Sequence, residues 1–131
     1  MGKDSEPTLI RKTSELIKQL NIYLNHFPKH EKYALAQRIR NNAYEIYDLI
    51  VEGEKRYFKK TSLTELDIAH ERLRLELFLA YELDYFGYKD GVTDSKATSA
   101  HRYQTISKMV DELGKMIGGW IKNLKDVQKW N

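Results

Sequence analysis

The stretch 63–86 constrains the fold most, because its apolar residues fall on two opposite sides of a helix. One set recurs at alternating steps of three and four residues, the spacing of a helix-bundle seam: Leu66, Ala69, Leu73, Glu76, Ala80, Leu83 and Gly87. A second set lies about 200° round the helix at roughly 100° per residue: Ile68, Leu75, Leu79 and Phe86. A helix buried on one side needs only the first set. We therefore expect this helix to be covered twice, once by its own chain and once by a second copy.

Local signals mark both ends of this helix. Ser62 stands three residues before Glu65 and just ahead of the apolar run, which predicts a capping box. Gly87 follows the run and is expected to end the helix in the left-handed conformation. Glu76 is the one charged residue in the seam, so it is either tilted toward water or buried and paired with a cation of another helix.

Three further segments carry helical spacing, and we expect helices at about 7–27, 29–58 and 99–129. Pro28 ends the first of them, and a cap at Thr98 or Ser99 begins the last. Their seams consist of three sets of residues: Leu9, Thr13, Leu16, Leu20, Tyr23 and Phe27; Ala36, Ile39, Ala43, Ile46, Ile50, Gly53 and Tyr57; and Tyr103, Ile106, Val110, Leu113, Ile117, Trp120, Leu124 and Val127. Before the last helix comes a polar turn region with Gly91 at its centre. Four helices with short connections favour an all-α, antiparallel up-and-down four-helix bundle that occupies residues 1–131 as a single domain.

Composition sets outer limits on function. The 131 residues include 22 Lys and Arg against 19 Asp and Glu, and the resulting net charge of +3 permits an acidic partner without requiring one. Cysteine is absent, which removes disulfides and thiolate metal sites and fits a cytoplasmic location. The first residues lack the apolar core of a signal peptide, and no run approaches membrane-spanning length, so no membrane partner is expected.

Two groups of cations are candidates for binding nucleic acid. The first, here called the lysine line, recurs along the outward side of the last helix over roughly 30 Å and consists of Lys108, Lys115, Lys122, Lys125 and Lys129. The second lies between the second and third helices, around Tyr57 and Phe58, and consists of Lys55, Arg56, Lys59 and Lys60. Cations can hold phosphates, and aromatic rings can stack on a base. Alternatively, the lysine line is a solvated helix face, and the two aromatics cover the end of the bundle.

Three glycines interrupt the last helix: Gly114, Gly118 and Gly119. Each costs about 1 kcal/mol relative to alanine inside a helix, so something must approach the backbone closely. A neighbouring helix explains them better than a ligand does. We therefore place Gly114 and Gly118 with Ile68, Leu75, Leu79 and Phe86 in the predicted interface between copies.

The sequence offers little for catalysis. A carboxylate-bridged metal pair in a bundle needs Glu-x-x-His on two helices, and only Asp67 with His70 approaches that spacing. His26 and His30 are separated by Pro28, which breaks the helix that would align them. No phosphate loop, nucleophile elbow or zinc motif is present. We expect no catalytic residues, no metal and no cofactor, and a metal-dependent bundle enzyme remains an alternative.

Two segments resemble a known family. FPKHEKYALAQRIRNNAYEIYDLIVEG, residues 27–53, resembles the second helix of the four-helix-bundle proteins from intervening sequences of bacterial 23S ribosomal RNA genes. ISKMVDELGKMIGGWIKNL, residues 106–124, resembles the last helix of the accessory variability determinant of diversity-generating retroelements, including Gly114, Gly118, Trp120 and Ile121. The resemblance covers residues 9–125, and no motif in it is catalytic.

The resemblance implies a homopentameric barrel of four-helix bundles. It also implies a basic surface that binds RNA, with DNA as a further candidate, and a reverse transcriptase partner that copies a template RNA into mutagenised complementary DNA. The alternative within the same fold is an intervening-sequence protein with an RNA-related role and no reverse transcriptase partner. The resemblance also places an arginine at Arg40, so we expect Arg40 to pair with Glu76 inside the bundle.

Overall fold

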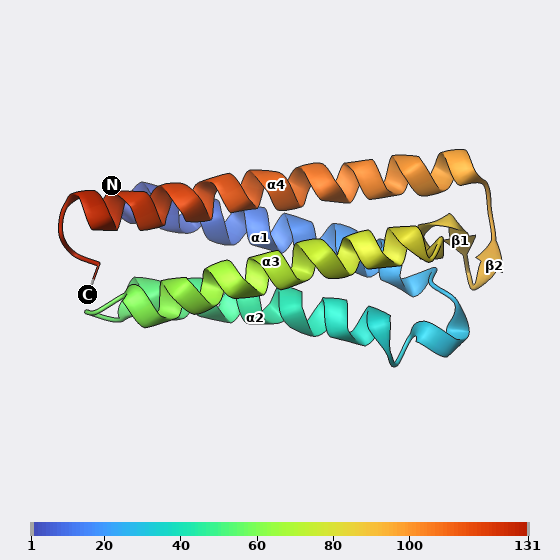
Figure 1. The fold of residues 1–131 in the computed structure, drawn as a ribbon, viewed down its shortest axis with the longest axis horizontal. Helices are drawn as coiled ribbons and strands as arrows, with labels where there is room; N and C mark the ends of the chain where they lie inside the picture. The colour runs from blue at the N-terminus through green and yellow to red at the C-terminus, as the bar shows by residue number, and fades with distance from the viewer. Residues whose placement is uncertain (1, 131) are drawn as a thin grey trace.

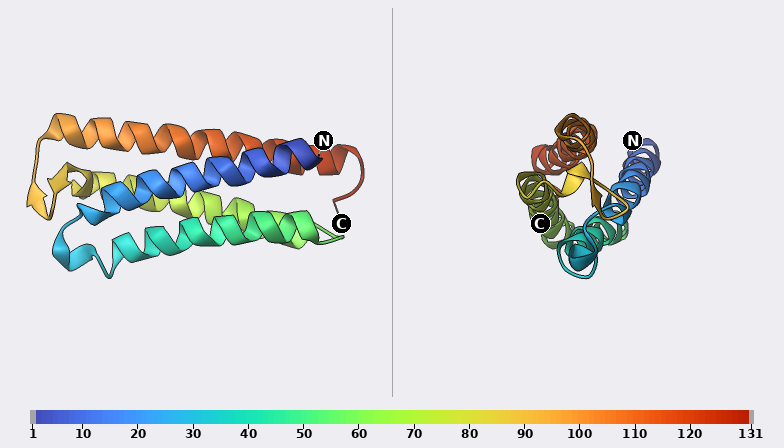
Figure 2. Two further views of the ribbon diagram at one scale, coloured as in Figure 1. Left: turned by 180° about the vertical axis from the view of Figure 1, so that it is seen from behind. Right: turned by 90° about the vertical axis from the view of Figure 1, so that its right-hand side faces the viewer.

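Four long helices run antiparallel to one another in the computed structural model, which describes the backbone of residues 2–130 and the side chains of residues 8–130 (Figure 1). They are α1 (Gly2–Asn25), α2 (Leu35–Lys55), α3 (Lys60–Glu82) and α4 (Lys96–Asp126). Seen end-on, they follow one another around the bundle in chain order, and α1 also contacts α4 (Figure 2). The predicted all-α up-and-down four-helix bundle is therefore confirmed. Over the described part of the chain, no helix combines the length and apolarity that crossing a membrane requires.

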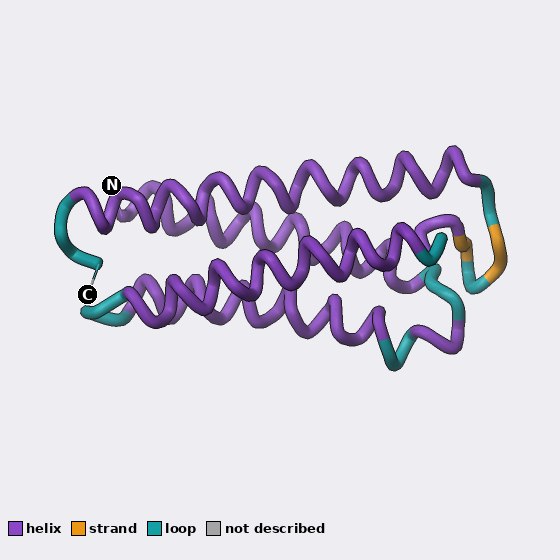
Figure 3. Tube along the Cα trace, viewed as in Figure 1, coloured by secondary structure: helices purple, strands orange, loops and turns teal. Residues whose placement is uncertain are grey.

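Loops and short elements lie at the two ends of the bundle (Figure 3). One end holds the α2–α3 connection and the segment that follows α4. The other end holds the 3-10 helices η1 (Lys29–Glu31) and η2 (Tyr85–Gly87) and a two-stranded antiparallel hairpin, β1 (Tyr88–Lys89) with β2 (Val92–Thr93). Asp90 and Gly91 connect its strands with φ angles of 51° and 79°, the pair of positive angles that a tight hairpin turn requires. Gly91 thus lies at the centre of the predicted turn region, but the hairpin itself was not predicted.

The predicted seams build most of the core. Buried side chains at seam positions come from all four helices: Leu16 and Leu20; Ile39, Ile46 and Ile50; Leu66, Ala69, Leu73 and Ala80; and Ile106, Val110, Leu113 and Ile117. Three predicted seam residues near helix ends are exposed instead: Tyr57, Leu83 and Val127. The period of the apolar residues is therefore reliable within the helices and fails at their ends.

The second apolar set of α3 divides between surface and core. Ile68, Leu75 and Leu79 are 52%, 49% and 46% exposed, as the two-sided pattern predicts for a single chain. The placement of Phe86 in this set was wrong, because Phe86 is 1% exposed. Helix α3 ends at Glu82, and the chain then reverses through residue 84, whose φ of 62° is left-handed.

The reversal inserts Phe86 into an aromatic cluster at this end of the bundle. The Phe86 ring meets the edges of Phe27 and Tyr23 at centroid distances of 5.4 and 6.1 Å. Asp84 therefore supplies the left-handed residue that was predicted at Gly87, and Gly87 lies buried in η2.

The predicted capping box at the start of α3 and the predicted cap of α4 were also wrong. Helix α3 begins three residues earlier than expected, so Ser62 is buried within its first turn, with Oγ 3.4 Å from Oε1 of Glu52. Helix α4 begins at Lys96, and its cap is Ser95, whose Oγ accepts a hydrogen bond from the Thr98 amide at 3.1 Å. Thr98 and Ser99, the two predicted caps, both lie inside the helix, and Ser99 is buried.

The predicted pair between Arg40 and Glu76 does not form. Arg40 donates instead to the side-chain oxygens of Asn21 and Asn25 in α1, at 2.9 and 3.3 Å. Glu76 accepts a hydrogen bond from Asn42, and its other oxygen lies 3.5 Å from Nε of Arg38. The carboxylate is therefore paired with α2 as expected, but through residues two positions on either side of Arg40.

The glycines of α4 have different surroundings. A Cβ built on Gly114 would lie 2.6 Å from Cε1 of His70, whose Nε2 is 2.7 Å from the Val110 carbonyl oxygen. The absence of a side chain at Gly114 thus makes room for a neighbouring helix of the same chain, and this accounts for Gly114 without an interface between copies. A Cβ on Gly118 or Gly119 would meet nothing within 4 Å.

These surroundings predict opposite effects of alanine. Gly114→Ala should lower the free energy of unfolding by about 1–3 kcal/mol, because the added methyl displaces the buried His70 ring. Gly119→Ala, the matched control, should raise it by about 0.5–1 kcal/mol, because alanine is the better helix former in open space. Denaturant titration at equal chain concentrations measures both. A Gly114→Ala variant as stable as Gly119→Ala would show that His70 does not occupy this position.

Candidate nucleic-acid interface

The lysine line faces solvent. All five of its residues are exposed, as predicted. Two of them make local contacts: Lys122 Nζ lies 3.2 Å from Oδ2 of Asp126, and Lys125 Nζ lies 5.1 Å from the centroid of a Trp130 ring. Within residues 8–130, Lys108, Lys115 and Lys129 have no ion pair. They are therefore free to meet an external anion.

The last lysine of the line departs from the helix. Helix α4 ends at Asp126 rather than at the expected residue 129, because Gln128 takes a left-handed φ of 56°. The Lys129 amide donates to the Leu124 carbonyl at 2.8 Å, and the Gln128 amide donates to the Lys125 carbonyl at 3.1 Å. These two bonds form a Schellman motif. The motif turns the chain back across the end of the bundle and takes Lys129 with it.

The cations between α2 and α3 have unequal roles. Lys59 Nζ donates to the carbonyl oxygens of Gly53, Glu54 and Arg56, at 2.6, 3.2 and 2.9 Å. These carbonyls belong to the C-terminal turn of α2, which leaves acceptors unpaired and carries a partial negative charge. Lys59 is therefore a cap of α2, and this cap explains why the helix ends at residue 55 and not at 58. Lys55 and Lys60 are exposed.

The two aromatic residues of this connection do not cover the bundle. Tyr57 is 87% exposed and Phe58 is 66% exposed, so the alternative in which they seal the end of the core is contradicted. Their rings contact each other edge to face, with centroids 4.8 Å apart and planes at 84°. They remain available for contact with another molecule.

The two cation groups meet at one cavity, here called the end cavity. It has a volume of about 610 Å³, and its lining joins the α2–α3 connection to the end of α4: Lys55, Arg56, Tyr57, Phe58, Lys59, Leu124, Gln128 and Lys129. The sequence analysis considered the two groups separately and did not predict that residues of both line one cavity. Of the predicted binding residues, Lys60, Lys108, Lys115, Lys122 and Lys125 do not line the cavity.

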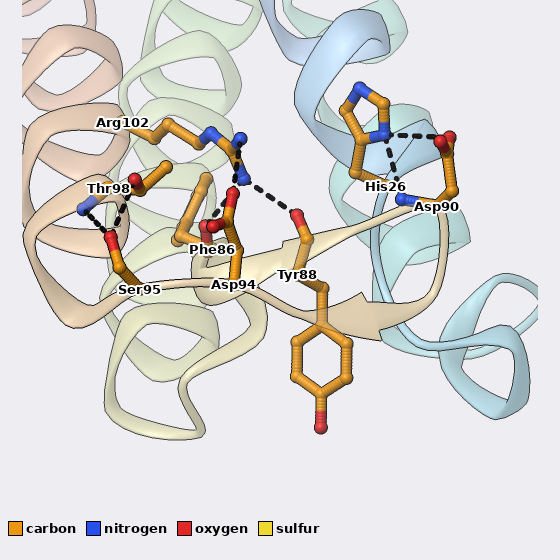
Figure 4. Close-up of polar contacts among 8 residues, drawn as sticks. All are labelled: His26, Phe86, Tyr88, Asp90, Asp94, Ser95, Thr98 and Arg102. Carbon is orange, nitrogen blue, oxygen red and sulfur yellow. Dashed lines mark hydrogen bonds and ion pairs between the residues drawn. The ribbon is translucent and has the colours of Figure 1, made fainter.

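The opposite end of the bundle is held by polar contacts that the sequence analysis did not single out (Figure 4). Arg102 of α4 donates through Nη1 to the carbonyl oxygens of Phe86 and Tyr88, at 3.1 and 2.6 Å, and its Nη2 lies 3.4 Å from Oδ2 of Asp94. On the other side of the hairpin, His26 Nδ1 lies 3.1 Å from the Asp90 amide nitrogen. These contacts fix the hairpin to α4 and to the residue that follows α1.

Tyr85 adds a further bond at this end. Its hydroxyl donates to Oε1 of Glu31 at 2.9 Å, while the other carboxylate oxygen accepts from the Leu35 amide at 3.1 Å. Burial raises the pKa of the Tyr85 phenol, and the hydrogen bond to Glu31 raises it further. Glu31 thereby caps α2, which explains why α2 begins at Leu35 rather than at residue 29.

Paired charges surround the exposed apolar face of α3, which consists of Ile68, Leu75 and Leu79. Arg74 donates to Glu71 through Nε and Nη2, at 2.9 and 2.7 Å, and the hydrogen bond from Arg74 lowers the pKa of Glu71. Arg72 of α3 lies 3.8 Å from Glu45 of α2. These two pairs add no net charge to the face, and its three aliphatic side chains suit a protein surface better than a phosphate backbone.

The histidine and carboxylate side chains that the structure describes form no metal-binding cluster. Among residues 8–130, no three His, Asp or Glu side chains lie close enough to hold a metal ion. His70, which the sequence analysis considered with Asp67, is buried against the Val110 carbonyl, whereas Asp67 is exposed.

Comparison with protein families identifies a match over most of the chain. A family model described as bAvd-like matches residues 8–124, a range that includes most of α1, all of α2 and α3, and nearly all of α4. No curated protein sequence matches the chain.

The contacts of Lys59 predict a role in stability. Lys59→Met should lower the free energy of unfolding by about 1–3 kcal/mol, because three carbonyls lose a charged donor. Lys60→Met removes an exposed ammonium one residue further on, and it should change the free energy by less than about 0.5 kcal/mol. Thermal and denaturant unfolding measure the difference. Equal stabilities of the two variants would contradict the capping role.

Proposed function

The chain belongs to the bAvd-like family, and we propose that it is a non-catalytic accessory protein of a diversity-generating retroelement. In this proposal it binds a reverse transcriptase and its template RNA in the cytoplasm and supports mutagenic synthesis of complementary DNA. The match over residues 8–124 carries the proposal, because it spans the whole bundle and not one helix. The exposed cations of α4 and of the α2–α3 connection support it, since an accessory protein of this kind must contact nucleic acid.

The proposed assembly is a homo-oligomeric ring, and the family resemblance favours five chains. Ile68, Leu75 and Leu79 support it, because an apolar face bordered by paired charges is suited to burial against another copy. The exposed Gly118 and the open space around it are compatible with a close approach by that copy. Five chains of net charge +3 carry +15, so the ring attracts nucleic acid more strongly than one chain does.

The proposed nucleic-acid surface is the lysine line, supported by the cations of the α2–α3 connection. Binding through these side chains is mainly electrostatic and depends little on base sequence. RNA is the expected ligand, and DNA fits the same contacts. Lys59 contributes only its charge, because its donors are already used on α2.

Co-purification with the reverse transcriptase tests the proposal as a whole. The genes beside this one should encode a reverse transcriptase, and the two proteins expressed together should form a stable complex that makes complementary DNA from the template RNA. A chain that binds RNA but does not associate with the polymerase would instead favour the intervening-sequence alternative.

A charge introduced on the apolar face tests the ring. Leu79→Glu should dissociate the oligomer while leaving the bundle folded, because the side chain lies on the surface of the single chain and burial of an unpaired carboxylate opposes assembly. Val92→Glu is the matched control, since Val92 is also exposed but lies in the hairpin. Sedimentation velocity at micromolar concentration, with circular dichroism to check folding, gives the answer. A Leu79→Glu variant with the mass of the parent would place the interface elsewhere.

A charge reversal tests the lysine line. Changing Lys115 and Lys122 together to Glu should weaken RNA binding and lower the slope of log affinity against log salt concentration by about 1.4, which is about 0.7 per lost phosphate contact on a single strand. The control changes Lys18 and Lys32 to Glu and so alters the net charge equally. Lys18 lies in α1 and Lys32 in the η1–α2 segment, and both are exposed. It should leave the slope nearly unchanged. If both double variants bind alike, only net charge matters and the lysine line is a solvated face.

A further inference from the structure

The end cavity combines positive charge with exposed rings and contains no acidic side chain. Its lining includes Lys55, Arg56, Lys59 and Lys129, and none of the eight lining residues is Asp or Glu. Its volume of about 610 Å³ lies within the range of roughly 300–1,000 Å³ that is usual for small-ligand sites. An anionic ligand with a flat, stackable part fits these features.

The cations of the cavity differ in what they can offer a ligand. Lys59 is committed to the carbonyls of α2, and Arg56 lies 3.0 Å from Oε1 of Glu52. Within residues 8–130, Lys55 and Lys129 have no ion pair and are exposed. These two ammonium groups are therefore the ones available to hold a phosphate. They come from different parts of the chain, since Lys55 ends α2 and Lys129 follows α4.

The aromatic part of the cavity is a ready surface for stacking. The Tyr57 ring is 87% exposed, and the Phe58 ring contacts it edge to face, which limits the orientations that the Tyr57 ring can take. Leu124 adds apolar lining. Stacking on an aromatic ring tolerates every base, but it requires a base that is free of its partner strand.

We propose that the end cavity binds an unpaired nucleotide of single-stranded nucleic acid, with its base stacked on Tyr57 and its phosphate held by Lys55 and Lys129. The inference rests on the proposed function and deepens it, because it divides binding between two surfaces. The lysine line attracts any phosphate backbone, whether single-stranded or double-stranded. The end cavity adds affinity only for the single strand, and it thereby favours single-stranded RNA, such as a template, over duplex.

Substitution of the tyrosine tests the inference directly. Tyr57→Ala should weaken binding of a fluorescein-labelled oligouridine by about 5- to 150-fold, the range for loss of one base–aromatic stack. Binding of an RNA duplex of equal length should stay within twofold of the parent, and the salt slope should not change. Fluorescence anisotropy measures all three. Since Tyr57 is exposed, the variant should melt at the temperature of the parent.

Tyr33→Ala is the matched control. Tyr33 is 92% exposed and lies beside Lys32, so it offers the same chemistry at the other end of the bundle. It should leave oligouridine binding within twofold of the parent. Equal losses from Tyr33→Ala and Tyr57→Ala would overturn the inference, because they would show general adhesion to exposed tyrosines.

Covalent mapping gives a second, independent measurement. An oligonucleotide that carries 5-iodouracil should photocrosslink to Tyr57 or Phe58, because the halogenated base reacts with a ring stacked on it, and mass spectrometry identifies the residue. Crosslinks confined to α1 or to the middle of α4 would overturn the inference.

The arms of the experiment separate this inference from the proposed function. If Tyr57→Ala binds oligouridine as the parent does, while reversal of Lys115 and Lys122 abolishes binding, the end cavity is not a nucleotide site and the accessory function stands. If the parent binds neither single strand nor duplex, the nucleic-acid function fails with it. If Tyr57→Ala loses only the reverse transcriptase, the cavity is a protein-binding surface and the inference is wrong.

Discussion

The structure depends on a helix, α3, that is apolar on two opposite sides. Its inner side, which includes Leu66, Leu73 and Leu77, packs in the bundle core beside α2 and α4. Its outer side leaves Ile68, Leu75 and Leu79 about half exposed. Three exposed aliphatic side chains in one row cost free energy in water, and burial against the proposed second chain would remove that cost.

The apolar and cationic surfaces occupy different parts of the molecule. The outer side of α3 is apolar, while the lysine line is exposed, and within the described side chains only Lys122 of its five residues forms an ion pair. The end cavity lies where α2 ends, α3 begins and α4 ends, and none of its lining residues belongs to the apolar face of α3. An assembly made through α3 can therefore leave the cationic surfaces free. This arrangement accounts for how a chain of modest net charge can present a concentrated positive surface.

The sequence predicts the interior of the helices well and their ends poorly. Burial of Ile39, Ile106 and Ile117 follows from the seven-residue period, because each helix has one side facing the core. Helix ends depend on single hydrogen bonds from side chains to backbone, and the donor Lys59 is set by the tertiary path of the chain. Ser62 resembles a cap in sequence but is buried within the first turn of α3. The Asp90-Gly91 dipeptide, by contrast, is a hairpin signal that periodicity reasoning overlooked. The end cavity could not be predicted, because it joins residues 55–59 to residue 129.

Hydroxyl-radical footprinting of the unmodified protein tests the two-sided burial of α3 most directly. At micromolar concentration the side chains of Ile68, Leu75 and Leu79 should be protected from oxidation, and dilution should expose them together as the chains separate. Tyr33 and Val92, which are exposed at the hairpin end, should be oxidised equally at every concentration. Oxidation of Ile68, Leu75 and Leu79 to the same extent at high and low concentration would contradict burial of this face against a second copy.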